Sequence, residues 1–545
     1  MTDFNRHPGS YLHWRLHVEG PTATLELAIQ PDKTHGTGYE LKLNSYDLGV
    51  DIELADALQR IRFEHPAVTT LVFKSGIDRI FSAGANIRML ASSSHPFKVN
   101  FCKYTNETRL GLEDLSSKSG VHTIAALNGL AAGGGYELAI ACDRIYLVDD
   151  GNSAVSLPEV PLLGVLPGTG GLTRLVDKRK VRRDHADIFC TIAEGIRGPK
   201  AKDWHLIDDC FPKSRFDEKV RAIVDELNTN TKARGDKGIA LSPIEPELSD
   251  NAISYRYVSV DLQPEKRIAT VTVRGPDGPE PQSGADYLER GDEAWALRAF
   301  RELDDAICSL RFDHEKIGLW LLRTRGDMDA ILEVEKSLAR NQDHWLVREI
   351  TYFIARTLRR WDLSARSLFA LVDQESAFAG VFLELALGSD RIYMYDSTLD
   401  DNTNVEVAVG PLSSGLVPMS HGLTRLENRF LREPERAERL AREMPRLAGP
   451  EAFAAGLVTV LADDIDWDDE VRLAVEERVS LSPDALTGME ASLRFGGSEN
   501  CDSKIFGRLS AWQNWIFTRP NATGEEGALV RYGQPEAATF DWRRT

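Results

Sequence analysis

The chain has 545 residues, of which 42% are hydrophobic and 27% charged, enough for two to four domains with large cores. Its formal net charge of -19 argues against nucleic acid as a partner, because proteins that wrap polyanions usually present a basic face. The six cysteines form no CxxC pair and no histidine cluster has metal spacing, so we expect reduced thiols and no metal. No segment resembles a signal peptide or a membrane span, which predicts a cytoplasmic protein without a membrane partner.

The first ninety residues predict alternating strands and helices. Residues 11–30 alternate apolar and polar side chains around a Gly-Pro break, as a β-hairpin does. Residues 51–66 place their leucines and an isoleucine on one helical face, and residues 68–76 form a short β-branched strand. A strand, helix, strand order predicts a parallel sheet with crossover helices.

Two segments that follow could border a ligand. FSAGANIRML, at 81–90, predicts a small-residue turn into a helix, where a ligand could approach the backbone; a close-packed strand-helix corner is the alternative. Residues 98–112 predict an amphipathic helix with Cys102 and Asn106 on one face. Core filling is the ordinary explanation for such a cysteine.

The stretch 125–175 carries the strongest chemical signal. Three glycines, 133 to 135, stand directly before a helix-like run, so unobstructed backbone N–H groups can point at an anion. The positive end of the helix that begins there strengthens such a site. These donors would stabilise an enolate or a tetrahedral anion, and a second donor from the turn at Ala85 would complete a two-point oxyanion hole.

Two carboxylates accompany the glycines. Glu137 falls in the first turn of the expected helix, and Glu159 follows Pro158 after a strand-like segment. Taken singly, Glu137 could interact favourably with the helix dipole, and Glu159 could be a solvated loop residue. Taken together, they can position and deprotonate a water while one of them returns the proton.

The order of these motifs resembles a known family. NG-x-A-x-GGG-x-E-L, CD-x-I-Y, P-E and PG-x-GG-x-x-RL resemble the signature of the crotonase (enoyl-CoA hydratase/isomerase) superfamily. FSAGANI resembles the oxyanion and adenine-binding turn of that superfamily, and the match spans about residues 12–225. The resemblance implies an acyl-CoA thioester substrate, with no cofactor because coenzyme A is part of the substrate.

The resemblance also assigns roles to residues. It implies that Ala85 and Gly134 supply the oxyanion N–H groups and that Glu137 and Glu159 are the acid/base pair. Glutamate at both positions is similar to the hydratases of the superfamily. We expect Cys102 to line the pocket that receives the acyl group.

Four further residues would line the coenzyme A groove by the same resemblance: Lys42, Ala83, Asn86 and Ile87. The family usually has aspartate where this chain has Asn86, which sets that contact apart from the other three.

A basic run follows the central stretch, with Lys178, Arg179, Lys180, Arg182 and Arg183. A solvated surface is the ordinary explanation of such a run. A contact to coenzyme phosphate is one alternative, and RNA binding is another, because some crotonase relatives bind RNA through a basic helix.

The second half repeats the first. Residues 366–393 align with the central stretch without gaps at an offset of 247, which places Glu384 on Glu137, and at the same offset Glu406 further along falls on Glu159. The three glycines become Gly-Val-Phe at 380–382, and FSAGANI becomes the charged DMDAILEVEKSL. We therefore expect both oxyanion turns to be lost and this unit to be a structural pseudo-subunit that packs against the first.

The sequence thus predicts an α/β fold of tandem crotonase-like (ββα superhelix) units, the second degenerate, with a helical C-terminal region. The expected domains are a catalytic unit at 1–229, a linker at 230–255, a degenerate unit at 256–479, and a helical cap and arm at 480–545. In the last region, helical spacing predicts core positions for Leu509, Trp512, Trp515 and Ile516. Crotonase relatives generally assemble, so we expect a homo-oligomer, a dimer.

The duplicated length and the segments KLNSYDLGVDIELADALQRIRFEHP, NFCKYTNETR and LNGLAAGGGYELAIACD resemble one branch of the superfamily. The resemblance implies opening of the ring of an epoxide of benzoyl-CoA with two waters, which releases formate. Two alternatives remain at this point: an enoyl-CoA hydratase acting on linear substrates, and a non-catalytic homologue that binds RNA or a protein partner.

Overall fold

The computed structural model describes residues 2–398, 404–497 and 499–545. The chain divides into two compact units, an N-terminal unit from Asp3 to Pro243 and a C-terminal unit from Ile244 to Thr545 that also includes Thr2. Each unit has its own sheets and its own core.

The boundary between the units lies inside the segment 230–255 that the sequence assigns to a linker. Part of this segment is regular structure, because β13 (Glu247–Ser249) and β14 (Ala252–Ser254) form an antiparallel pair. β14 in turn pairs with β15 (Val258–Gln263), so these residues extend the sheet of the C-terminal unit.

A six-stranded sheet, ordered β1-β2-β4-β7-β9-β12, forms the framework of the N-terminal unit. Its strands are β1 (Trp14–Glu19), β2 (Thr22–Leu27), β4 (Thr70–Ser75), β7 (His122–Leu127), β9 (Arg144–Asp149) and β12 (Asp209–Pro212). β1 and β2 form the predicted hairpin, and all later neighbours are parallel, as the strand, helix, strand order predicted.

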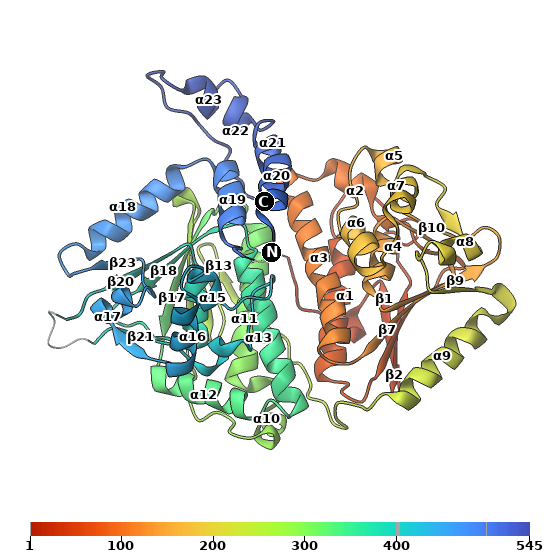
Figure 1. The fold of residues 1–545 in the computed structure, drawn as a ribbon, viewed down its shortest axis with the longest axis horizontal. Helices are drawn as coiled ribbons and strands as arrows, with labels where there is room; N and C mark the ends of the chain where they lie inside the picture. The colour runs from red at the N-terminus through yellow and green to blue at the C-terminus, as the bar shows by residue number, and fades with distance from the viewer. Residues whose placement is uncertain (1, 399–403, 498) are drawn as a thin grey trace. The chain divides into compact units, whose positions relative to one another are not determined.

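The helices of the N-terminal unit are α1 (Leu48–Phe63), α2 (Ile87–Ser92), α3 (His95–Ser117), α4 (Gly134–Ala141), α5 (Glu159–Leu163), α6 (Gly171–Thr173), α7 (Arg183–Thr191), α8 (Gly198–Asp203) and α9 (Phe216–Asn230). Asp47 caps α1 by accepting hydrogen bonds from the first amides of the helix, which fixes where α1 begins. α1 and α3 pack side by side (Figure 1). On α9, Phe216, Val220, Val224 and Leu227 recur at helical spacing and cover one face of the sheet.

A second sheet, ordered β11-β10-β8-β5, carries the segments that the sequence marked as chemical. Its strands are β5 (Arg79–Ser82), β8 (Gly129–Ala132), β10 (Ala154–Ser156) and β11 (Ile196–Arg197). β3 (Ser45–Tyr46) and β6 (Gly84–Ala85) form a short parallel pair, and β6 follows β5 directly in the sequence. The glycine turn joins β8 to α4, so the end of β8 positions the candidate site.

The C-terminal unit repeats this architecture. Its eight-stranded sheet contains, after β13, β14 and β15, the strands β16 (Ile268–Arg274), β17 (Leu319–Arg325), β18 (Ser367–Val372), β20 (Arg391–Tyr395) and β23 (Val460–Ala462). β15 and β16 are antiparallel and the later neighbours are parallel, which is the pattern of β1 to β12. The main helices are α10 (Gly284–Arg290), α11 (Trp295–Asp313), α12 (Met328–Arg340), α13 (Trp345–Asp362), α14 (Val381–Leu387), α15 (Arg425–Arg429), α16 (Pro434–Glu443) and α17 (Gly449–Ala454).

The smaller sheet of this unit, β19-β21-β22, corrects the sequence alignment. Its strands are β19 (Phe378–Ala379), β21 (Glu406–Ala408) and β22 (Arg446–Ala448). Ala379 pairs with Ala408 in the C-terminal unit as Ala132 pairs with Ser156 in the N-terminal unit. Equivalent residues of the two units therefore differ in number by 252 in this strand, and not by the 247 of the gapless alignment. Glu406 therefore lies in a strand, where it pairs with Arg446, and it is not the counterpart of Glu159. The position equivalent to Glu159 is Pro411.

The C-terminal helices are α18 (Trp467–Ser480), α19 (Pro483–Leu493), α20 (Cys501–Arg508), α21 (Asn514–Ile516), α22 (Pro520–Thr523) and α23 (Ala528–Arg531). The helical character of this region was predicted correctly, but the expected core positions were wrong. Leu509 is 52% exposed, and Trp512, Trp515 and Ile516 are only partly buried. Helical spacing identified an apolar face there, but within this unit nothing buries that face completely.

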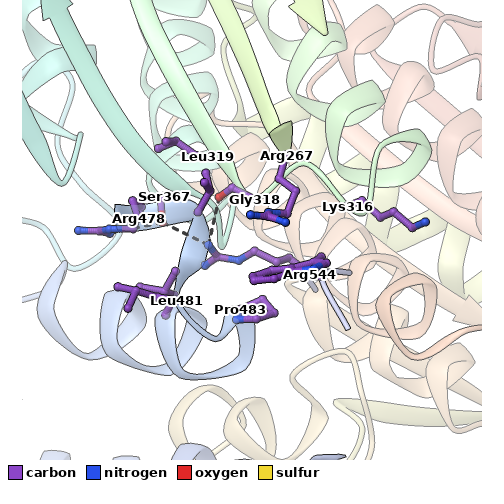
Figure 2. A pocket seen from close by; sticks show the side chains of 12 residues that line it. Arg267, Lys316, Gly318, Leu319, Ser367, Arg478, Leu481, Pro483 and Arg544 are labelled. Atoms are coloured by element: carbon purple, nitrogen blue, oxygen red, sulfur yellow. Dashed lines mark hydrogen bonds between the residues drawn. The ribbon is translucent and has the colours of Figure 1, made fainter. Parts of the chain in front are cut away.

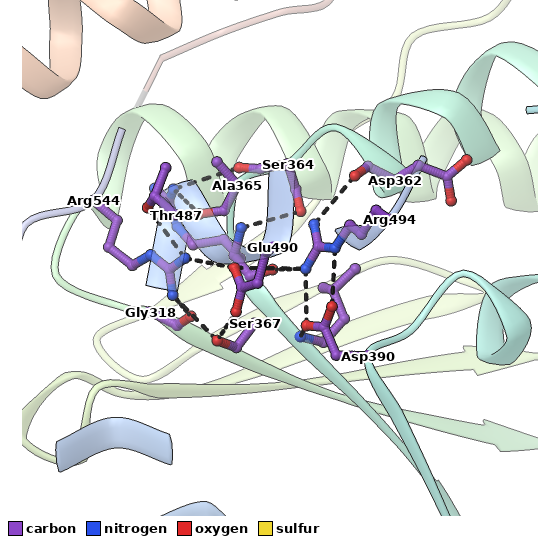
Figure 3. A network of polar contacts seen from close by, with 12 residues as sticks. Gly318, Asp362, Ser364, Ala365, Ser367, Asp390, Thr487, Glu490, Arg494 and Arg544 are labelled. Carbon is purple, nitrogen blue, oxygen red and sulfur yellow. Dashed lines mark hydrogen bonds and ion pairs between the residues drawn. The ribbon is translucent and has the colours of Figure 1, made fainter. Parts of the chain in front are cut away.

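A buried polar network fastens the end of the chain to the C-terminal unit. The Arg544 guanidinium points to the carbonyl oxygen of Gly318, at 3.0 Å, and to Ser367 (Figure 2). It also forms an ion pair of 2.7 Å with Glu490 (Figure 3). Glu490 in turn pairs with Arg478 at 3.0 Å. Burial alone would raise the pKa of Glu490, but Arg544 and Arg494 lower it below its ordinary value.

Replacement of Arg544 by Met should lower the free energy of unfolding of the C-terminal unit by about 3–5 kcal/mol, because it removes one partner of a buried ion pair. Urea denaturation of the full chain measures the change. Arg543→Met is the matched control, because Arg543 is a half-exposed neighbour that pairs only with the half-exposed Asp541. Equal effects of the two substitutions would contradict a stabilising role of the network.

Candidate active site

The site is organised by a backbone turn that only glycine adopts easily. Gly133 has φ +53° and ψ −129°, and its N–H donates to the carbonyl oxygen of Ser156 at 2.9 Å, which ties the turn to β10. α4 begins at the next residue. The amides of a first helical turn have no acceptor within the helix, so the N–H of Gly134 is available to an anion.

The second expected donor lies next to the first. A Cβ atom placed on Gly84 would lie 2.6 Å from the Gly134 nitrogen, so β6 passes directly beside the start of α4. The pairing of Tyr46 with Ala85 in the β3–β6 ladder fixes the path of this strand. The structure thus brings Ala85 and Gly134 together, as the oxyanion-hole hypothesis requires.

Glu159 reaches back to the glycine turn from the first position of α5. A Cβ atom on Gly133 would lie 2.7 Å from Glu159 Oε1, which gives a second reason for glycine at that position. Glu159 Oε2 is buried and has no hydrogen-bond partner among the residues that the structure describes. Burial, followed by the negative charge of Glu137, raises the pKa of Glu159 to about 7.

Glu137 is the more firmly held carboxylate. It is 2% exposed, and its Oε1 accepts hydrogen bonds from the amides of Thr169 at 2.8 Å and Gly171 at 2.9 Å. Burial raises the pKa of Glu137, while these two amides and the charge of Arg109 act in the opposite direction. The loop PGTGG, which the sequence singled out, therefore orients this carboxylate.

Cys102 borders the same space from α3. A Cβ atom on Gly168 would lie 3.0 Å from Cys102 Sγ, and Asn106 on the same face donates to the Gly168 carbonyl oxygen at 2.9 Å. Burial, with a smaller contribution from Glu137, raises the pKa of the Cys102 thiol to about 11. At neutral pH Cys102 is therefore a neutral thiol and a poor nucleophile.

Three residues of the site were missed by the sequence reasoning: Tyr46, Asp51 and Arg109. Arg109 and Asp51 form an ion pair with both side chains almost fully buried. The Arg109 guanidinium carbon lies 5.5 Å from the centre of the Tyr46 ring. The only signal in the sequence was a charged residue on the inner face of each of two expected helices, and nothing in the sequence paired them.

The four residues expected in the coenzyme A groove differ in their exposure to solvent. Lys42 is exposed and pairs with Glu40 at 3.0 Å, and Ile87 is 56% exposed. Ala83 is half-buried, and its N–H donates to the carbonyl oxygen of Leu43 at 3.0 Å. The Asn86 side chain caps α2 and donates to the Glu40 carbonyl oxygen at 2.8 Å, so its polar atoms are already used.

Carboxylates pair with much of the basic run. Lys178 lies 3.0 Å from Glu113, Arg179 lies 3.0 Å from Asp208, and Arg182 lies 2.5 Å from Asp184. Paired cations of this kind leave little net positive charge on the segment. The pairing favours the ordinary interpretation of the run as a folded, solvated surface.

The C-terminal unit retains the glycine turn, contrary to the expectation that both oxyanion turns are lost. Gly380 has φ +54° and ψ −122°, close to the values at Gly133. A carboxylate from α12 fills the space beside it, because a Cβ atom on Gly380 would lie 2.3 Å from Glu335 Oε1. Glu335 Oε2 accepts from the Leu412 amide at 3.2 Å. α12, the helix that replaces the FSAGANI turn, thus fills the space beside Gly380 with the Glu335 side chain, which acts as a plug.

The second carboxylate of this unit is also neutralised. Glu384, the counterpart of Glu137, accepts a hydrogen bond from Ser413 at 2.6 Å and pairs with Arg425 at 3.3 Å. Arg425 pairs with the buried Asp362 as well, at 2.7 Å. In the N-terminal unit the equivalent arginine, Arg174, binds Glu113 instead, and Glu137 has backbone amides as its partners.

Comparison with known proteins places the chain in a family. The enoyl-CoA hydratase/isomerase family matches residues 40–295. The chain is 52% identical to benzoyl-CoA-dihydrodiol lyase from Aromatoleum evansii over 546 aligned positions, which cover 100% of this chain and 98% of that protein. The chain therefore belongs to the enoyl-CoA hydratase/isomerase (crotonase) family.

Two further similar proteins match less than half of the chain. Mitochondrial enoyl-CoA hydratase from Pongo abelii is 32% identical over 226 residues, 40% of this chain and 73% of that protein. A crystal structure of an enoyl-CoA hydratase from Geobacillus kaustophilus is 32% identical, covers 40% of this chain and 75% of its own, and has a TM-score of 0.35. The family membership and the mixed sheets and helices of both units confirm the α/β crotonase-like class expected from the sequence.

In the described parts of the chain, no helix is both long and apolar enough to cross a membrane. The same residues contain no group of three or more acidic, histidine or cysteine side chains suited to a metal ion.

Glu335→Gln should make the C-terminal unit less sensitive to alkaline pH. Burial, with a smaller contribution from Glu384, raises the pKa of Glu335 to about 8, from 4.5 when exposed. Between these values the unfolded chain has lost a proton that the folded chain retains, so stability falls by up to about 1.4 kcal/mol per pH unit as pH rises. Urea denaturation from pH 5 to 8 should show the difference between the variant and the wild type shifting in favour of the variant.

Glu333→Gln is the control for this experiment, because Glu333 lies on the same helix but is exposed and pairs with Lys336. Its stability difference from the wild type should not change with pH over the same range. A constant difference for Glu335→Gln would show that Glu335 is not a buried, largely protonated plug.

Proposed function

We propose that the N-terminal unit opens the ring of 2,3-epoxybenzoyl-CoA with two waters, giving 3,4-dehydroadipyl-CoA semialdehyde and formate in aerobic benzoate degradation. The chain is an enzyme of the lyase class, since it is 52% identical along its whole length to a protein named benzoyl-CoA-dihydrodiol lyase. The observation that carries the chemistry is the placement of Glu159 against the glycine turn, with Glu137 close enough to shift its pKa.

The amides of Ala85 and Gly134 form the oxyanion hole in this proposal. They hold the thioester oxygen, and the dipole of α4 adds to their effect. Withdrawal of electrons through the thioester makes the ring carbons more electrophilic, which favours addition of water and stabilises the enolate that follows. The close approach of β6 to the Gly134 nitrogen supports this pair of donors.

The two glutamates divide the proton transfers. Two backbone amides hold the charge of Glu137, which suits a base that takes a proton from water. Glu159 has a pKa raised to about 7 and a buried oxygen without a partner, which suits an acid that returns a proton to the ring. Cys102 lines the pocket as a neutral thiol beside them.

Lys42, Ala83, Asn86 and Ile87 line the coenzyme A groove in this proposal, and the enzyme needs no cofactor other than the coenzyme A of its substrate. The exposed ammonium group of Lys42 can leave its ion pair with Glu40 and bind a coenzyme phosphate instead. The Asn86 side chain caps α2, so it contributes to the groove through its backbone and its position.

The C-terminal unit is a silent copy in this proposal. Glu335 occupies the place of the ligand beside Gly380, and Arg425 neutralises Glu384. A thioester oxygen would have to displace a carboxylate that is already hydrogen-bonded to Leu412. We assign this unit a structural role.

A linear enoyl-CoA hydratase is the alternative enzyme, because it would use the same oxyanion hole and glutamates. The full-length match to the lyase favours ring opening, whereas the match to the Pongo abelii hydratase covers 40% of the chain. Turnover of crotonyl-CoA and of epoxybenzoyl-CoA, assayed side by side with detection of formate, separates the two. Crotonyl-CoA hydration without formate release from epoxybenzoyl-CoA would overturn the proposal.

Glu137→Gln and Glu159→Gln should each reduce formate release from epoxybenzoyl-CoA by about a hundredfold or more, because each removes a positioned proton carrier. Both variants keep the size of the side chain, so their circular dichroism should match the wild type. The control is Glu218→Gln, an exposed residue of α9 that pairs with Arg215. Near-normal formate release by both folded active-site variants would end the assignment.

The pH dependence of kcat/KM should identify Glu159 as the acid. A residue that must be protonated to act loses activity as pH rises through its pKa, so kcat/KM should fall through about pH 7. Profiles of the wild type and Glu159→Gln from pH 5 to 9 provide the test, and the variant should lack this limb. An increase in wild-type kcat/KM through pH 7 that Glu159→Gln abolishes would instead make Glu159 the base.

A further inference from the structure

The side chain of Tyr46 ends in the active site with an unused hydroxyl group. Tyr46 is 4% exposed, and among the described residues its hydroxyl oxygen makes no hydrogen bond of normal geometry, although the Thr169 side chain is close enough to lower its pKa. A Cβ atom on Gly134 would lie only 2.0 Å from that oxygen, so the hydroxyl points at the first residue of α4. Buried hydroxyl groups are usually hydrogen-bonded, so one without such a bond beside the proposed oxyanion hole is a candidate donor to the substrate.

The surrounding residues hold Tyr46 in this orientation. The Tyr46 carbonyl oxygen accepts from the Asn86 amide at 2.9 Å, which adds to the β3–β6 ladder. Its ring lies between the Arg109 guanidinium and the ring of Phe101, whose centre is 6.2 Å away. The hydroxyl therefore has a fixed position before any ligand binds, as preorganised catalytic donors do.

We propose that Tyr46 is a catalytic residue whose hydroxyl donates a hydrogen bond to the thioester oxygen of the substrate, as a third donor beside the amides of Ala85 and Gly134. This inference rests on the proposed function. It adds a side-chain donor to a hole that the sequence described with backbone donors alone.

Tyr46 acts as a donor that keeps its proton. Burial raises the pKa of the Tyr46 hydroxyl well above its usual range, and the positive charge of Arg109 only partly opposes this. Glu137 raises the pKa further. A neutral phenol in a water-poor site strengthens its hydrogen bond as negative charge develops on the oxygen, so it favours the transition state over the ground state.

The proposal also explains Gly134. Any side chain at position 134 would occupy the place of the Tyr46 hydroxyl. Glycine at this position therefore leaves room for the phenol in addition to exposing the backbone amide. In the C-terminal unit the equivalent residue is Val381, whose side chain is buried, and the chain segment of β6 is replaced by α12.

Tyr46→Phe tests the proposal, because it removes the hydroxyl oxygen and keeps the ring. With epoxybenzoyl-CoA we expect kcat to fall about a hundredfold with little change in KM, as for the loss of one oxyanion-hole donor. The dissociation constant for benzoyl-CoA, which lacks the epoxide, should change little. The melting temperature should stay the same or rise, because the substitution removes a buried hydroxyl that has no partner.

Tyr11→Phe is the matched control. The Tyr11 hydroxyl donates to Asp56 at 2.5 Å in the same unit, so its loss should lower the melting temperature and leave kcat unchanged. The two variants should therefore show opposite patterns. All turnover is measured well below the lowest melting temperature, so that differences in stability do not enter kcat.

The outcomes separate this inference from the proposed function. If Tyr46→Phe keeps a kcat near the wild type while Glu137→Gln is inactive, Tyr46 is not a catalytic donor and the proposed function stands. If Tyr46→Phe weakens benzoyl-CoA binding and kcat/KM while kcat is unchanged, its hydroxyl binds the ground state only, and the inference fails. If both glutamate variants release formate normally, the proposed function itself fails.

Discussion

The positive-φ turn between a strand and a short helix is the constraint on which the rest of the site depends. At Gly133 this turn directs the first amides of α4 outward and leaves no room for a side chain, so that Glu159 can approach. The same geometry fixes Glu137 in the first helical turn, where the loop at Thr169 orients it. One backbone conformation thus places an anion site and two carboxylates together, before any substrate contributes binding energy.

The same glycine turn occurs in both units, but a different side chain lies against it in each. In the C-terminal unit the dihedral angles at Gly380 are nearly those at Gly133, but Glu335 from α12 lies against the glycine. Burial raises the pKa of Glu335 to about 8, so at neutral pH the side chain fills the turn mainly as a neutral carboxyl group. The C-terminal unit therefore keeps the turn, with the Glu335 side chain filling the space beside it.

Much of the fold and the main carboxylates could be predicted from sequence, because hydrophobic periodicity and glycine spacing are local signals. The hairpin, α1, α3 and the glycine turn followed from them. The ion pair of Arg109 with Asp51 joins residues far apart in sequence, and the unpartnered Tyr46 hydroxyl is visible only in three dimensions. Glu406 was assigned wrongly because five additional residues precede β21, and a gapless alignment cannot detect them.

The distribution of cations explains which copy can perform acid/base chemistry. Carboxylates bonded directly to a guanidinium lose basicity, since the positive charge favours the ionised form. In the C-terminal unit Arg425 pairs with both Asp362 and Glu384, and its charge opposes the rise in the pKa of Glu384 that burial causes. In the N-terminal unit Arg174 is engaged by Glu113 and Arg109 by Asp51, which keeps both cations from bonding Glu137. The Glu137 carboxylate therefore keeps the backbone amides of Thr169 and Gly171 as its hydrogen-bond partners.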